Sequence, residues 1–150
     1  MSKPGAPTTT SGLANEPASE AERAKVKAER ALIVSILNYS MTDFDQIMTQ
    51  SGNIINVNME SSGKMTPLHT AAAHGRRDIC EKLLAKKANV NPKNGLGFTP
   101  LTNAVLNGHE ACVSLLLKAG AEKNVTTIKG DTPLSLAQAR GYNNLVDLLK

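Results

Sequence analysis

Apolar and polar positions follow the period of an α-helix over most of the chain. In residues 19–38 the apolar residues Val26, Ile33 and Leu37 recur at helical spacing, after a charged and alanine-rich stretch. Ser19, with a glutamate three residues later, has the pattern of an N-terminal capping box. The pattern predicts a helix that begins near Ser19 and packs mainly through its second half.

The same pattern predicts further helices in pairs. One helix is expected over residues 42–52, with Thr42 or Asp43 as its N-cap and Phe44 on its packing face. Three pairs of short helices follow. Their first helices are predicted at 67–74, 100–107 and 133–140, and their second helices at 77–86, 110–119 and 143–150. The fold class that follows is all-α.

These pairs repeat with a fixed period of 33 residues. A Thr-Pro-Leu segment begins at Thr66, Thr99 and Thr132, and a glycine and a leucine keep the same offset further along. The threonine can cap a helix, and the proline suits the first helical position because its missing N–H is not needed there. A period of this size predicts supersecondary units stacked in a line.

The residues of the first unit carry a family resemblance. TPLHTA at Thr66–Ala71 resembles the ankyrin-repeat pattern T-P-L-H-x-A. Gly97, Gly130 and the stretch LLLKAGAEKN fit that family too. The resemblance implies an ankyrin-repeat solenoid of stacked helix-turn-helix units with projecting β-turn or hairpin loops. Lys64 departs from the pattern, because it stands where Gly97 and Gly130 stand in the later units.

The chain is therefore expected to have three parts. Residues 1–18, rich in Pro, Gly, Ser and Thr, are predicted to form a disordered tail. Residues 19–62 are predicted to form an N-terminal helix and a degenerate capping repeat, because they lack the Thr-Pro-Leu segment. Residues 63–150 are predicted to form three ankyrin repeats, at 63–95, 96–128 and 129–150.

Charge is spread unevenly along the chain. Residues 1–62 hold five Lys and Arg against seven Asp and Glu, whereas residues 63–150 hold twelve against six. Solvated basic side chains on helix faces account for this most simply. The alternative is nucleic-acid binding, which is disfavoured because no aromatic platform for base stacking accompanies the basic cluster. That cluster consists of Arg76, Arg77, Lys82, Lys86 and Lys87.

Residues that could carry chemistry are few. The sequence has no phosphate-loop, H-E-x-x-H or Cys-x-x-Cys motif, so it predicts no enzyme activity, no cofactor and no metal site. Cys80 and Cys112 are expected to be buried free thiols, and His69 to make a structural hydrogen bond to a neighbouring loop. With no secretory signal and no apolar run long enough to span a membrane, we expect a soluble, cytoplasmic protein, with the nucleus as an alternative.

We therefore expect the protein to act by binding another protein through its surface. The resemblance implies that partners bind the concave face and the projecting turns. Phe98 is expected to anchor an exposed apolar strip on the turns, unless these side chains pack locally instead. The candidate contact residues on the turns and on the ends of the first helices are Met65, His74, Leu96, Phe98, Leu106, Asn107, Ile128, Asp131 and Arg140.

The expected role is that of an adaptor, regulatory subunit or scaffold component, monomeric on its own. Residues 99–125 also resemble the matching repeat of small ankyrin proteins of the myotrophin type, which regulate actin-capping protein. Regulation of that kind is a further alternative.

Overall fold

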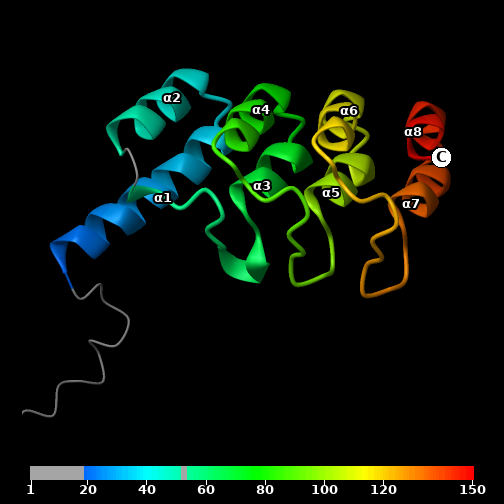
Figure 1. Cartoon of the computed structure of the whole chain (residues 1–150), viewed down its shortest axis with the longest axis horizontal. Helices are drawn as coiled ribbons and strands as arrows, with labels where there is room; N and C mark the ends of the chain where they lie inside the picture. The colour runs from blue at the N-terminus through cyan, green and yellow to red at the C-terminus, as the bar shows by residue number, and fades with distance from the viewer. Residues whose placement is uncertain (1–18, 52–53) are drawn as a thin grey trace, which may run out of the picture.

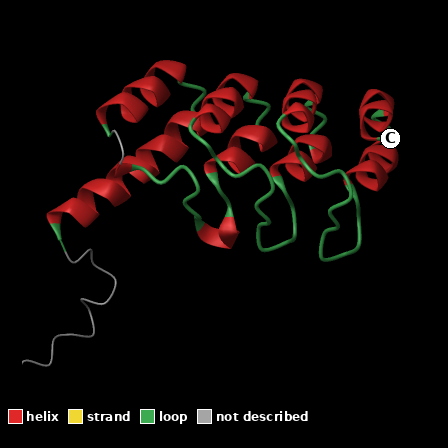
Figure 2. Ribbon diagram, viewed as in Figure 1, coloured by secondary structure: helices red, strands yellow, loops and turns green. Residues whose placement is uncertain are grey.

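Helix pairs stacked in one row make up the fold (Figures 1 and 2). The computed structural model describes residues 19–51 and 54–150, and within these ranges it contains helices and loops but no strand. The all-α prediction is confirmed. The successive pairs are α1 (Glu20–Leu37) with α2 (Met41–Gln50), α3 (Pro67–Ala73) with α4 (Arg77–Ala85), α5 (Pro100–Leu106) with α6 (Glu110–Lys118), and α7 (Pro133–Arg140) with α8 (Asn143–Leu149).

The row has two layers. The first helices, α1, α3, α5 and α7, form one layer, and the second helices, α2, α4, α6 and α8, form the other (Figure 1). The loop that precedes each of α3, α5 and α7 projects away from both layers (Figure 2). The first of these loops contains a short 3-10 helix, η3 (Ser62–Lys64). The expected disordered tail, residues 1–18, lies outside the described residues.

Side-chain capping starts the first helices as the sequence predicts. Thr66, Thr99 and Thr132 each accept a hydrogen bond from the backbone N–H three residues later, and proline fills the first helical position. At α1, Ser19 Oγ accepts from the N–H of Glu22 at 3.2 Å. These caps satisfy backbone donors that have no partner within the helix.

The predicted cap of α2 is wrong. The N-cap is Ser40, whose hydroxyl accepts from the N–H of Asp43 at 3.2 Å, and not Thr42 or Asp43. Ser40 has an extended backbone, with φ −95° and ψ 100°, so the helix can begin at the next residue, Met41. The expected end of this helix at Gly52 lies outside the described residues.

Small side chains let the first helices approach one another closely. Ala71, Ala104 and Ala137 are fully buried, and α3 packs on α5 as α5 packs on α7. Leucines complete a core that runs through the stack. Five leucines of the repeats are buried, Leu68, Leu83, Leu101, Leu116 and Leu149, and Leu134 is half-buried.

Hydrogen bonds also join each unit to the next. The Oδ1 atom of Asn58 accepts from the N–H of Asn89 at 2.7 Å, and Asn91 accepts from Glu122 in the same way at 3.0 Å. At the opposite end of the first helices, His109 Nε2 donates to the carbonyl of Ala73 at 3.0 Å. These contacts fix the register between neighbours.

His69 makes the structural hydrogen bond that its sequence position predicts. Its Nδ1 accepts from the N–H of Thr66 at 3.1 Å, and its Nε2 donates to the carbonyl of Phe98 in the next loop at 2.8 Å. This pairing defines a neutral ring, protonated on Nε2. Burial lowers the pKa of His69 below its ordinary value, although the hydrogen bond to Phe98 opposes the shift.

The lowered pKa of His69 predicts a loss of stability in mild acid. Below about pH 6.5 the unfolded chain binds a proton on this residue that the folded chain does not, so the free energy of unfolding falls as pH falls. The slope is at most about 1.4 kcal/mol per pH unit. Denaturant melts between pH 7.5 and 5.5 measure it.

His69→Thr is the matched control, because Thr102 occupies the same position in the next unit. The variant is expected to be less stable at pH 7.5 and to show a shallower fall toward pH 5.5. A variant with the same pH dependence as the parent chain would contradict this role of His69.

Candidate functional site

The three projecting loops have the same hairpin at their tips. We define the tips as residues 61–65, 94–98 and 127–131. In each tip the N–H of the first residue donates to the carbonyl of the fifth: Ser61 to Met65 at 2.8 Å, Asn94 to Phe98 at 2.9 Å and Thr127 to Asp131 at 2.9 Å. Each projecting loop is therefore a closed turn.

Side chains stiffen the second and third tips. Asn94 Oδ1 accepts from the N–H groups of Leu96 and Phe98, both at 2.9 Å. Thr127 Oγ1 accepts from Lys129 and Asp131, both at 3.2 Å. Because these backbone donors are satisfied within the tip, the turns hold their shape without a partner.

Backbone hydrogen bonds join the tips into one continuous row. The N–H of Gly95 donates to the carbonyl of Gly63 at 2.7 Å, and the N–H of Ile128 donates to the carbonyl of Leu96 at 3.1 Å. Neighbouring residues along the row are therefore 32 apart in the sequence, one fewer than the repeat period. This slip brings Leu96 and Ile128, which are not equivalent within their units, side by side.

Two aliphatic side chains of the predicted strip are exposed on this row. Leu96 is 53% exposed and Ile128 is 70% exposed. Met65, Phe98 and Asp131 are half-buried at the bases of the tips. Leu96 and Ile128 are thus the exposed large apolar side chains of the tips, whereas Phe98 is half-buried.

The other predicted contact residues lie at the far ends of the first helices, about 10 Å away along a seven-residue helix. His74 is half-buried, and its Nδ1 is 2.9 Å from the carbonyl of Thr70 in its own helix. Asn107 Nδ2 donates to the carbonyl of Asn103 at 2.9 Å. Leu106 is half-buried and Arg140 is exposed. The nine candidates therefore form two groups at opposite ends of α3, α5 and α7.

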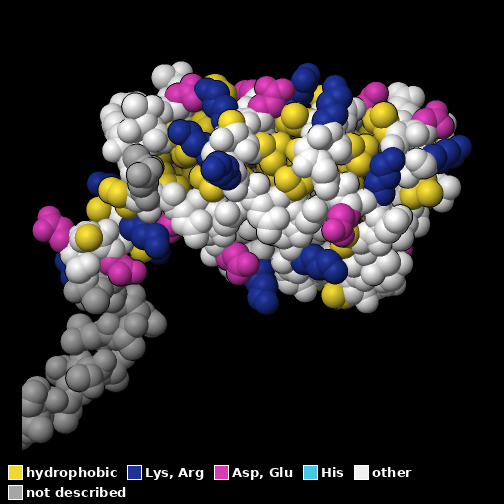
Figure 3. All heavy atoms as spheres, in the orientation of Figure 1, with side chains coloured by type: hydrophobic (Ala, Val, Ile, Leu, Met, Phe, Trp, Pro, Cys, Tyr) yellow, Lys and Arg dark blue, Asp and Glu magenta, His cyan; other side chains and the backbone are white. Residues whose placement is uncertain are grey.

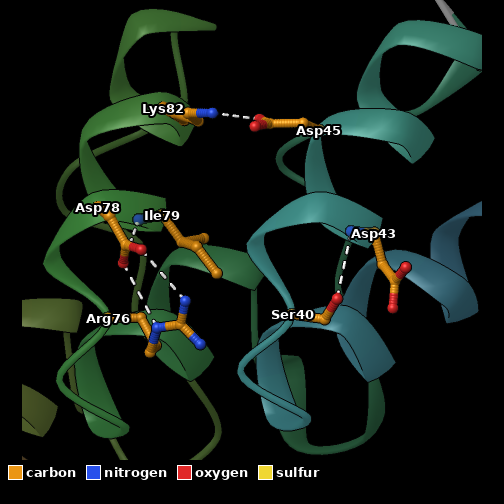
Figure 4. A network of polar contacts seen from close by, with 7 residues as sticks. All are labelled: Ser40, Asp43, Asp45, Arg76, Asp78, Ile79 and Lys82. Carbon is orange, nitrogen blue, oxygen red and sulfur yellow. Dashed lines mark hydrogen bonds and ion pairs between the residues drawn. The ribbon is translucent and has the colours of Figure 1, made fainter.

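The sequence suggested that Arg76 belongs to an exposed basic cluster, but in the structure it does not. Its side chain is buried and donates to both carboxylate oxygens of Asp78 (Figure 4). Its guanidinium carbon lies 4.9 Å from the centre of the Tyr39 ring. Its neighbour Arg77 is exposed and pairs with Glu81 at 3.1 Å. Arg76 joins the α1–α2 turn to the α3–α4 turn, which is a structural role.

Another member of that cluster also has an acidic partner. Lys82 on α4 pairs with Asp45 on α2 (Figure 4). On the face shown in Figure 3, Lys and Arg side chains are interspersed with Asp and Glu, and no single basic patch covers it. On this face, the distribution of charge gives the nucleic-acid alternative no support.

The two thiols lie next to each other in the core. Cys80 on α4 and Cys112 on α6 are both fully buried and free. The contact with the Cys112 thiol, together with burial, raises the pKa of Cys80. Within residues 19–51 and 54–150, no group of three or more metal-binding side chains comes together, and no helix is long and apolar enough to cross a bilayer.

One surface was missed from the sequence. Leu37 on α1 is 43% exposed, although its spacing with Val26 and Ile33 suggested a packing face, and Val34 on the same helix is 50% exposed. The length of the helix could have indicated this surface. With 18 residues, α1 is too long to be covered along its whole length by α3, which has only 7.

The tip row requires glycine at Gly97. A Cβ atom there would lie 3.0 Å from the backbone N of Ile128 in the next tip, and φ is +77°. Gly130 is the matched control, because its φ is +85° but nothing lies within 4 Å of its Cβ position.

Gly97→Ala is therefore expected to destabilise the chain more than Gly130→Ala. Strain at positive φ costs about 1–2 kcal/mol in either variant, and overlap with fixed backbone adds roughly 1–3 kcal/mol at Gly97 alone. Urea melts of the two variants measure the difference. Equal losses would mean that the tips do not touch in solution.

Arg76 and Arg77 provide a second comparison. Arg76→Ala is expected to lower the free energy of unfolding by about 1–3 kcal/mol, because it removes buried hydrogen bonds and packing against Tyr39. Arg77→Ala removes only an exposed pair and should cost under about 0.5 kcal/mol. Thermal or urea melts that rank the two variants the other way round would overturn this assignment.

Comparison with known families gives a match. A family model described as ankyrin repeats (3 copies) matches residues 32–127 and 86–150, which together span more than half of the chain. A search of curated proteins found no match.

Proposed function

This chain belongs to the ankyrin-repeat family, and from that premise we propose that it is an adaptor or regulatory subunit that binds a partner protein through its row of tips and the adjoining first helices. Ankyrin repeats generally act as protein–protein interaction modules and are typically not enzymes.

The observation that carries this proposal is the ordered, exposed apolar pair on the tips. The Ile128 to Leu96 hydrogen bond holds the two tips together, and both side chains are more than half exposed. Turns that already hold their shape lose little backbone conformational entropy when a partner covers them. A partner gains their burial without ordering the turns first.

The test is affinity capture with the intact chain, followed by titration of the captured partner. The double variant Leu96→Ser, Ile128→Ser is expected to weaken binding by more than tenfold. Its stability should change by under about 0.5 kcal/mol per site, because both side chains are solvent-exposed.

Ile54→Ser is the matched control. Ile54 is 52% exposed but lies on the connection after α2, away from the tips. This variant should bind the partner as the parent chain does. Undiminished binding by the double variant would place the working surface elsewhere.

A further inference from the structure

A second apolar surface lies beside the first tip. The long helix α1 extends past the row of first helices, next to the segment that leads into the first tip (Figure 1). Between them is a groove of about 560 Å³. Its walls are mainly Val26, Ile33 and Val34 of α1 on one side and Met59 on the other.

The α1 wall is one face of a helix. Val26, Ile33 and Val34 recur at helical spacing, and the stretch that they span is about 12 Å long, slightly more than two turns. Val34 is half exposed, and Val26, Ile33 and Met59 are half-buried. An open aliphatic wall of this length matches two turns of a second helix.

Acidic groups flank the aliphatic wall. Glu29 lines the groove from α1, and Glu60 lines it from the opposite side. Glu29 Oε1 is inaccessible to solvent and has no hydrogen-bond partner in the described part of the chain, although Arg30 also lines the groove. A carboxylate oxygen without a donor is unfavourable. Because Glu29 as a whole is only half-buried and lines the groove, a small rotation of its carboxylate would let a bound ammonium or guanidinium group supply that donor.

We propose that this groove docks an amphipathic helix of a partner protein, with apolar side chains against Val26, Ile33 and Val34 and a Lys or Arg on Glu29. Because Ser61 and Ser62 line the groove and belong to the first loop, the docking site is continuous with the row of tips. The inference rests on the proposed protein-binding function and adds the chemistry of one recognised segment.

A pair of synthetic helical peptides tests the proposal without knowledge of the natural partner. The first is a capped 14-residue peptide with leucines at three- and four-residue spacing and lysines elsewhere, and the second carries glutamates in place of the lysines. Each is titrated into the full chain labelled with ¹⁵N, and amide shifts are followed by NMR.

The lysine peptide is expected to shift amides of residues 26–34 and 59–62 and to bind at least tenfold more tightly than the glutamate peptide. The chain carries a net charge of +4, so non-specific attraction would favour the glutamate peptide instead. Equal binding of the two peptides, or shifts confined to other surfaces, would overturn the proposal.

Two variants at neighbouring positions sharpen the test. Glu29→Gln is expected to weaken the lysine peptide about fivefold, whereas Arg30→Gln, which removes a positive charge from the same groove, should leave its affinity unchanged or raised. Unchanged affinity for Glu29→Gln, with an unchanged melt, would contradict the role of the carboxylate.

The other occupants give distinguishable results in the same experiment. Shifts of the groove amides that depend on protein concentration, with no peptide present, would identify a second copy of the chain. Broadening of these amides by a nitroxide on Thr10→Cys, at low protein concentration, would identify the chain's own N-terminal segment. Either result would replace the proposal. Loss of partner binding at the tips alone would leave the groove result intact, so the two proposals fail separately.

Discussion

Short helices that cannot stand alone impose the main constraint on this molecule. The helices α3, α5 and α8 have seven residues each, too few to be stable in water by themselves. Each unit therefore depends on its neighbours, through the alanine-lined contacts between first helices, the asparagine side chains beneath them and the backbone bonds between tips. The rigid row of tips follows from this stacking.

Much of the fold could be predicted because its determinants are local and repeated. Threonine caps, helical prolines and buried alanines recur at one period, so the stack of helix pairs follows from the sequence. The cap of α2 was predicted wrongly at Thr42 or Asp43, because these residues have capping side chains as Ser40 does. Only the backbone conformation at Ser40 distinguishes them.

The surface was harder to predict because it depends on contacts between units. The sequence repeats every 33 residues and does not indicate that paired residues of neighbouring tips are 32 apart. The contact between Leu96 and Ile128 is therefore visible only in the structure. Arg76 looked exposed beside Arg77, but the Tyr39 ring from the preceding turn covers it. Leu37 fitted a packing stripe, yet no element of the described chain covers it fully. In each case the deciding partner lies in another unit or is absent.

The inter-unit hydrogen bonds described above all join adjacent units and never skip one. Consequently, a whole 33-residue unit copied between two existing ones would meet suitable partners on both sides. Tandem duplication of the gene segment could thus lengthen the array by one tip without redesign of its core, because the geometry of each joint is specified locally. The number of units can therefore change without changing the contacts between any two neighbours. The length of the binding surface can then evolve independently of the stability of each interface between units.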